Sequence, residues 1–247
     1  MCIPHIFTPI ELSIKDWLKR DYSNRTDALA ILNAGITEPP LNLWVNQFVV
    51  TGHNRSKKLW QWRQARRLAD HNLSPEKILE KKAVELLNGD TWANQVNTAA
   101  GLSLNTGDRK RSIDLINMVA PGHYRFIELK IESNNPVYAA VELLEYALLY
   151  WWLRCRPDIL KPDADRDNKA LMKARHVVFE VLAPGNFYSG YSPTDLRKFA
   201  NVLTRAFQKL SEDKMEIEFV FTQFTDALPA AWSKTSIVKA LEHPKKV

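Results

Sequence analysis

Two acidic residues and a lysine stand in stretches that otherwise have the character of apolar β-strands. Asp114 lies inside residues 112–116, and Glu128 and Lys130 lie inside residues 126–131. Residues two apart on a strand share a face, so Glu128 and Lys130 are expected to point the same way. Carboxylate oxygens are the ligands that Mg²⁺ and Mn²⁺ prefer, and an adjacent ammonium can orient or help deprotonate an attacking water. These residue types therefore suit metal-assisted hydrolysis.

The separation of the two carboxylates suits a β-hairpin. A turn signal, Ala-Pro-Gly-His at residues 120–123, separates the two apolar stretches. A hairpin closed there can bring Asp114 and Glu128 side by side on neighbouring strands. Two acids at such a short distance repel each other unless a cation lies between them. The predicted hairpin is therefore consistent with a metal site.

The acid-x-lysine pattern alone is weak evidence, because it is common in this chain. Other copies occur at residues 80–82, 108–110, 167–169 and 212–214. Those copies fall on a predicted helix or in polar loops, whereas Glu128-x-Lys130 lies within an apolar strand. An edge strand with one solvated face would show the same pattern, and the charged residues would then form only a surface ion network. Both interpretations fit the pattern.

Helix and strand signals alternate along the chain from residue 75 onward. Ser74 followed by Pro75 is typical of a helix start. The predicted elements are a helix at 76–87, strands at 91–101, 111–119 and 124–131, a helix at 136–153, a strand at 176–182, a helix at 193–210 and a strand at 216–224. The sequence thus predicts an α/β protein with a central mixed β-sheet flanked by helices.

The part before residue 75 has a different character. Short helices are predicted at residues 10–20 and 25–33, followed by a stretch rich in tryptophan and basic residues. We therefore expect a mostly helical, basic N-terminal region over residues 1–74 and the α/β domain over residues 75–247.

The element order and the charged residues together resemble the restriction-endonuclease-like superfamily, the PD-(D/E)xK phosphodiesterases. The resemblance covers residues 75–224 and rests on Asp114, on Glu128-Leu129-Lys130 and on the order of helices and strands; Ile113 replaces the first proline of the motif. It implies a nuclease that uses Mg²⁺ or Mn²⁺ to hydrolyse nucleic-acid phosphodiester bonds, with DNA as the favoured substrate. It also implies that Asp114 and Glu128 bind the metal, that the carbonyl of Leu129 adds a ligand, and that Lys130 is catalytic.

Members of the superfamily often add an acid from the first helix, and Glu80 is our candidate for this catalytic and metal-binding role. On a helix, Glu80 shares a face with Val84, on the side that should meet the sheet, whereas Glu85 lies with Lys82 on the opposite side. The alternative for Glu80 is an ordinary surface position.

Some members also carry a Gln-xxx-Tyr motif on the helix after the lysine strand. Here Glu142 takes the place of the glutamine and Tyr146 is kept, so the motif is degenerate. The aromatic residues of this helix have helical spacing, which favours core packing over base stacking. They are Tyr138, Tyr146, Tyr150, Trp151 and Trp152.

Two clusters of basic residues are candidates for contacts with nucleic-acid phosphates. They comprise Arg55, Lys57, Lys58, Arg63, Arg66 and Arg67 in the first cluster and Arg109, Lys110 and Arg111 in the second. Trp60 or Trp62 could stack on exposed bases beside the first cluster. Solvated helix charges over a packing face rich in tryptophan would give the same pattern, so this alternative stays open.

The composition excludes a disordered, a collagenous and a disulfide-scaffold protein. The chain of 247 residues is 45% apolar and 25% charged, with a net charge of +6, which is typical of a globular protein and compatible with an anionic partner. Cys2 and Cys155 form no metal-binding cluster and indicate a reducing compartment. Neither a membrane span nor a signal peptide is indicated, so we expect a cytoplasmic protein.

Two further expectations follow from the resemblance. Many nucleases of this kind dimerise to cut both strands, so a homodimer is compatible with it. A catalytically inactive member of the fold that binds nucleic acid or a protein partner is the alternative to the enzyme, and the degenerate motif at Glu142 and Tyr146 favours that alternative.

Overall fold

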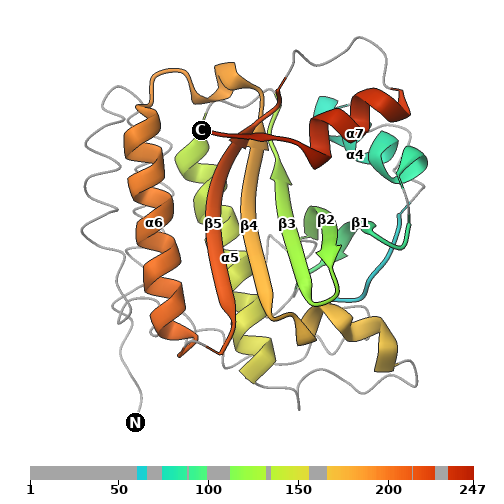
Figure 1. The fold of residues 1–247 in the computed structure, drawn as a ribbon, viewed down its shortest axis with the longest axis vertical. Coiled ribbons are helices and arrows are strands. Elements are labelled where there is room, and N and C mark those ends of the chain that lie inside the picture. Colours follow the sequence, from blue (N-terminus) through green and yellow to red (C-terminus); the bar gives the residue numbers. More distant parts are fainter. Residues whose placement is uncertain are drawn as a thin grey trace.

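In the described part of the chain, six strands form one open mixed sheet in the order β1-β2-β3-β4-β5-β6 (Figure 1). The computed structural model describes residues 60–65, 74–87, 89–98, 112–131, 135–155, 166–212, 214–225 and 233–247. The strands are β1 (Trp92–Asn97), β2 (Ser112–Ala120), β3 (His123–Leu129), β4 (His176–Ala183), β5 (Glu216–Gln223) and β6 (Lys245–Lys246). The pairs β3–β4 and β4–β5 are parallel and the other neighbouring pairs are antiparallel, so the predicted mixed sheet is confirmed.

Helices cover both faces of this sheet. They are α4 (Pro75–Leu86), α5 (Pro136–Cys155), α6 (Pro193–Leu210) and α7 (Lys234–Glu242), with 3-10 turns η1 (Arg166–Lys173) and η2 (Gly185–Tyr188). Residues of α5 and α6 pack with one face of the strands in a large apolar core, and residues of α4 and α7 pack with the other face in a smaller one. Figure 1 shows α4 and α7 side by side at one end of the sheet. The site described below lies where α4 meets the sheet.

The predicted order of elements from α4 to β5 is confirmed, and most boundaries agree to within a few residues. The Pro121-Gly122 turn closes the predicted hairpin, and Gly122 adopts a φ of 80°, which glycine tolerates without steric cost. The sequence did not predict α7, β6, η1 or η2. None of the helices in the described ranges is long and apolar enough to cross a membrane. The predicted helices at 10–20 and 25–33 lie outside the described residues.

Residues 60–65 run along the outer edge of β1. Trp60 donates its backbone N–H to the carbonyl of Asn97 at 2.9 Å, and Asn94 donates to the carbonyl of Arg63 at 3.1 Å. The Trp60 side chain is fully buried, with its ring centroid 5.8 Å from that of Phe126 and 5.0 Å from that of Tyr150. Base stacking by Trp60 is therefore the wrong interpretation, because its ring lies within the main core. The short segment 60–65 packs on the sheet although it precedes the predicted boundary at residue 75.

We expect Trp60→Ala to lower the free energy of unfolding by about 3 to 5 kcal/mol, because it leaves a large cavity between the sheet and α5. Urea unfolding followed by circular dichroism measures this loss. Trp62→Phe is the matched control: it removes the 3.0 Å hydrogen bond from Trp62 Nε1 to the carbonyl of Gly89 and should cost about 1 kcal/mol. Unchanged stability of Trp60→Ala would contradict the buried position.

Candidate active site

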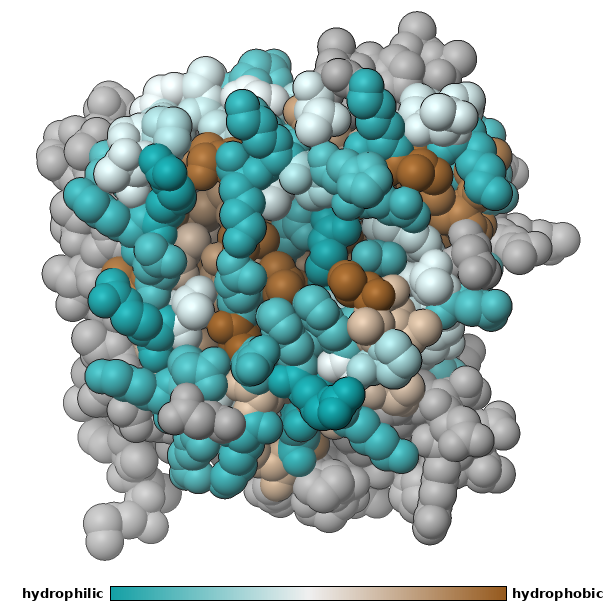
Figure 2. All heavy atoms as spheres, in the orientation of Figure 1, coloured by the Kyte–Doolittle hydropathy of each residue, from teal (hydrophilic) through white to brown (hydrophobic). Residues whose placement is uncertain are grey.

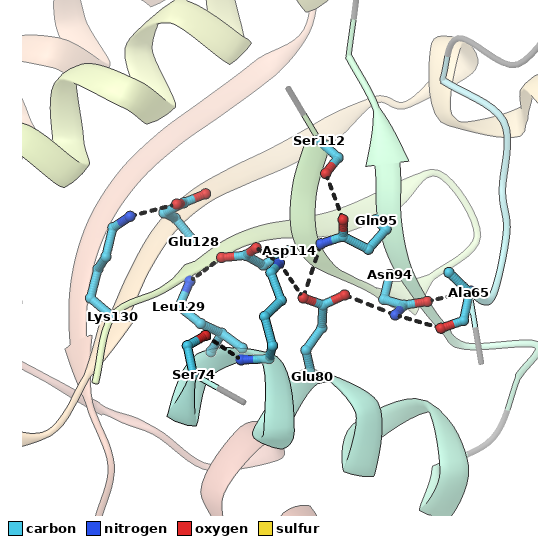
Figure 3. A network of polar contacts seen from close by, with 11 residues as sticks. Ala65, Ser74, Glu80, Asn94, Gln95, Ser112, Asp114, Glu128, Leu129 and Lys130 are labelled. Atoms are coloured by element: carbon cyan, nitrogen blue, oxygen red, sulfur yellow. Dashed lines mark hydrogen bonds and ion pairs between the residues drawn. The ribbon is translucent and has the colours of Figure 1, made fainter. Parts of the chain in front are cut away.

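The register of the β2–β3 hairpin places Asp114 across from Glu128. Leu115 pairs with Ile127 in this antiparallel hairpin, so the residue before Leu115, Asp114, lies opposite the residue after Ile127, Glu128. Asp114 Oδ2 accepts the backbone N–H of Leu129 at 3.1 Å, which ties the acid to the end of β3. Asp114 is 8% and Glu128 5% exposed, so these are buried acids and not members of a surface ion network. Figure 3 shows the carboxylates of Glu128, Asp114 and Glu80 lying near one another.

Lys130 is held on the Glu128 side of the hairpin. Its Nζ lies 2.8 Å from Glu128 Oε1 and 2.9 Å from Glu142 Oε2, and its backbone N–H donates to the carbonyl of Leu182 at 3.1 Å. The predicted shared face of Glu128 and Lys130 is therefore confirmed. Glu142, which replaces the glutamine of the motif on α5, becomes the second carboxylate on this lysine.

Glu80 is buried on the face of α4 that meets the sheet, as its helical position predicts. The helix begins after Ser74, whose Oγ accepts the backbone N–H of Lys77, and Pro75 fills the first turn, where no backbone hydrogen bond is lost. On the opposite face, Glu85 pairs with Lys82 at 2.7 Å. The apolar side of α4 packs into the smaller core, and Glu80 therefore lies against the strands.

Among the described residues, three side chains donate to the Glu80 carboxylate. Asn94 Nδ2 donates to Oε1 at 2.9 Å, Gln95 Nε2 donates to Oε2 at 2.9 Å, and Lys77 Nζ donates to Oε2 at 2.7 Å (Figure 3). Asn94 also accepts the backbone N–H of Ala65 at 2.6 Å, so residues 60–65 support the site from the sheet edge. Sequence reasoning missed Asn94 and Gln95, because on an ordinary strand neighbouring residues point to opposite faces.

The strand β1 is bent where it meets Asp114. Gln95 has a φ of 48°, in the left-handed region that a residue with a side chain seldom adopts, and the ladder between β1 and β2 skips Gln95 and Asp114. Ser112 Oγ donates to Gln95 Oε1 at 3.0 Å, which orients the glutamine amide toward Glu80. The bend lets both Asn94 and Gln95 reach one carboxylate. Backbone outliers of this kind concentrate at functional sites.

Lys77 lies between two of the predicted metal ligands. Its Nζ is 2.7 Å from Glu80 Oε2 and 3.0 Å from Asp114 Oδ1. The sequence offered one signal for it, the i, i+3 spacing from Glu80 on the same helix face. Its link to Asp114 required the tertiary structure.

Burial and mutual repulsion perturb the acids of the site. Burial, followed by the charge of Asp114, raises the pKa of Glu80 to about 7. Burial, then Asp114 and Glu142, raise the pKa of Glu128 above its ordinary value despite the favourable contact with Lys130. Burial would lower the pKa of each lysine, but the adjacent carboxylates outweigh it and raise the pKa of both Lys77 and Lys130. Both ammonium groups therefore stay charged, whereas the charged forms of Glu80 and Glu128 are disfavoured.

The donor set is chemically suited to a hard cation. In the described part of the chain, no three acidic, histidine or cysteine side chains are grouped so as to hold a metal ion, and an ammonium contacts each of Glu80, Asp114 and Glu128. Glu128 Oε2, however, is buried and has no hydrogen-bond partner among the described residues. An unsatisfied carboxylate oxygen beside a second acid fits Mg²⁺ or Mn²⁺, which take all-oxygen ligand sets.

The remaining predicted residues have mixed outcomes. Leu129 contributes its backbone N–H to Asp114, and the role of its carbonyl as a metal ligand stays a prediction. Arg63 is half-buried at the edge of β1, and its contact with phosphate also stays a prediction. The predicted contacts by Arg55, Lys57, Lys58, Arg66, Arg67, Arg109, Lys110 and Arg111 lie outside the described residues. On α5, core packing is confirmed for Tyr146, Tyr150 and Trp151.

Comparison of the chain with known proteins found no matching family model, no similar curated protein and no similar solved structure.

The Glu80 carboxyl predicts a pH dependence of stability in metal-free protein. Its folded-state pKa of about 7 exceeds the ordinary value of 4.5, so proton binding stabilises the folded state. This contribution is complete below about pH 4.5 and is lost as the pH rises through about 7. Over that window, the free energy of unfolding should fall relative to that of Glu80→Gln, by up to roughly 1.4 kcal/mol per pH unit.

Urea unfolding in EDTA at a series of pH values measures this difference. Glu85→Gln changes a carboxylate on the opposite face of the same helix and should follow wild type across the window. Parallel curves for wild type and Glu80→Gln would contradict the raised pKa.

Proposed function

We propose that this chain is a metal-dependent nuclease with a restriction-endonuclease-like core, and that DNA is its favoured substrate. The observation that carries the proposal is the hairpin site: two buried carboxylates, Asp114 and Glu128, occupy facing positions, and Lys130 follows two residues after Glu128. The element order from α4 to β5 supports the proposal, because the superfamily that the sequence resembles has a helix, three strands, a helix and a strand in its core.

Asp114, Glu128 and Glu80 would hold one or two Mg²⁺ or Mn²⁺ ions, with the carbonyl of Leu129 as an added ligand. Such an ion lowers the pKa of a bound water and neutralises negative charge at phosphorus. Lys130, fixed by Glu128 and Glu142, presents a charged ammonium beside the same carboxylates. In the proposed mechanism it orients the attacking water and stabilises the extra charge of the transition state.

Basic residues would bind the phosphate backbone of the substrate. Arg63 lies on the segment beside β1, and Asn94 of β1 connects that strand to Glu80. The predicted contacts at residues 55–58, 66–67 and 109–111 belong to the same proposal. A homodimer and a cytoplasmic location remain expectations.

The test is cleavage of labelled single- and double-stranded DNA and RNA in Mg²⁺, Mn²⁺ or EDTA. We expect metal-dependent cleavage by wild type and a loss of at least about 10²-fold in rate for both Asp114→Asn and Lys130→Met, since the first removes a ligand of the metal ion and the second removes the ammonium that stabilises charge at the phosphate. Circular dichroism and urea unfolding check that the variants fold. Lys82→Met removes a lysine from the exposed side of α4 and should cleave as wild type. Equal cleavage by wild type and both site variants would contradict the assignment.

A catalytically inactive protein of the same fold is the second candidate. The observation that favours it is the pairing of Lys77 and Lys130 with the acids, which gives those charges partners without a metal ion. This candidate predicts salt-dependent binding of nucleic acid or a protein partner with no cleavage in any metal. The same assay, with a binding measurement at two salt concentrations, separates the two.

A further inference from the structure

The Lys77 ammonium lies on carboxylate oxygens that a metal ion would need. It contacts Glu80 Oε2 at 2.7 Å and Asp114 Oδ1 at 3.0 Å, and these two acids come from α4 and β2. Lys77 therefore links the helix to strand β2 of the hairpin through two ion pairs. The other site lysine, Lys130, contacts Glu128 and Glu142 instead, so the two ammonium groups have separate partners.

An ammonium and a divalent cation cannot share the space between the same two carboxylates. Metal ligation uses the oxygen lone pairs that accept the lysine hydrogen bonds, and two cations held that close repel each other. If Glu80 and Asp114 bind a metal together, the Lys77 side chain must move away. This inference rests on the proposed function, because that proposal supplies the metal.

Lys77 is well placed to move. It lies in the first turn of α4, its side chain is 22% exposed, and its backbone N–H is held by Ser74 Oγ independently of the ammonium. The four-carbon stem can rotate toward solvent without disturbing the helix. Glu80 would keep its hydrogen bonds from Asn94 and Gln95 after the lysine leaves, so the carboxylate stays in position.

We propose that Lys77 is a resident counter-ion of the site: it holds Glu80 and Asp114 together in the metal-free protein and is displaced when a divalent cation binds. Lys77 thus preserves the ligand geometry in the absence of metal, at the cost of weaker metal binding. It is a positioning residue for the metal ligands.

Displacement can be measured directly on the wild-type protein. Lysine acetylation by an amine-reactive ester, read by mass spectrometry, is compared in EDTA and in saturating Mn²⁺. Lys77 should be protected in EDTA and should acetylate faster in Mn²⁺. Lys82 on the same helix, with a side chain 42% exposed, is the internal reference and should react equally in both conditions.

Mn²⁺ affinity gives a second readout that does not depend on activity. Electron paramagnetic resonance of free Mn²⁺ is used to titrate wild type and the variants Lys77→Met, Lys82→Met and Asp114→Asn. Lys77→Met should bind Mn²⁺ at least about tenfold more tightly, because its two charge-assisted hydrogen bonds no longer have to break on binding and one such bond corresponds to about that factor. Lys82→Met should match wild type, and Asp114→Asn should bind far more weakly.

The outcomes separate the two proposals. Faster acetylation of Lys77 in Mn²⁺, together with tighter Mn²⁺ binding by Lys77→Met than by wild type, supports the displacement. Mn²⁺ binding by Lys77→Met but not by wild type supports it as well. Mn²⁺ binding that depends on Asp114 but leaves Lys77 protected overturns the displacement and leaves the proposed function standing. Absence of Mn²⁺ binding by both wild type and Lys77→Met overturns the metal site on which both proposals rest.

Discussion

The balance of buried charge is the constraint on which the rest of the site depends. Four carboxylates, from Glu80, Asp114, Glu128 and Glu142, share the ammonium groups of Lys77 and Lys130. A buried charge is costly unless it is paired and hydrogen-bonded, so each of these groups needs a partner from another part of the chain. Burial, together with the repulsion from Asp114, keeps the pKa of Glu80 and Glu128 above its ordinary value.

Satisfying these charges fixes how α4 meets the sheet. The helix packs its apolar face on the strands, and polar contacts at its N-terminal end set the final position: Glu76 accepts the backbone N–H of Ile131 at 2.9 Å, and Lys77 reaches Asp114. Because these contacts tie α4 to β2 and to the residues that follow β3, a shift of the helix would break several hydrogen bonds at once. The site is therefore held by the same contacts that join two layers of the fold.

The bend in β1 is a local cost that the site offsets. The left-handed backbone at Gln95 is unfavourable for a residue with a side chain, yet it directs the Gln95 amide to Glu80. The Ser112 hydroxyl donates to the other end of that amide and orients it. The β2–β3 pairing has a second irregularity, a register shift between Met118 and Ala120. A separate buried ion pair, between Arg125 and Glu180 at 2.7 Å, connects β3 and β4. Two kinds of buried charge thus coexist: a closed pair in the sheet and an acid-rich cluster at α4.

Sequence patterns alone predicted the elements from α4 to β5, the shared face of Glu128 and Lys130, and the side of α4 that carries Glu80. Helix caps and the alternation of apolar residues are local signals, so Ser74-Pro75 and the strand at 126–131 could be interpreted without tertiary contacts. The tertiary structure alone decided that Lys77 pairs with Asp114, 37 residues away, that Gln95 turns toward Glu80, and that Trp60 is core. Those outcomes depend on which distant surfaces meet, because a lysine or a tryptophan has the same local pattern whether it faces solvent, a ligand or another strand.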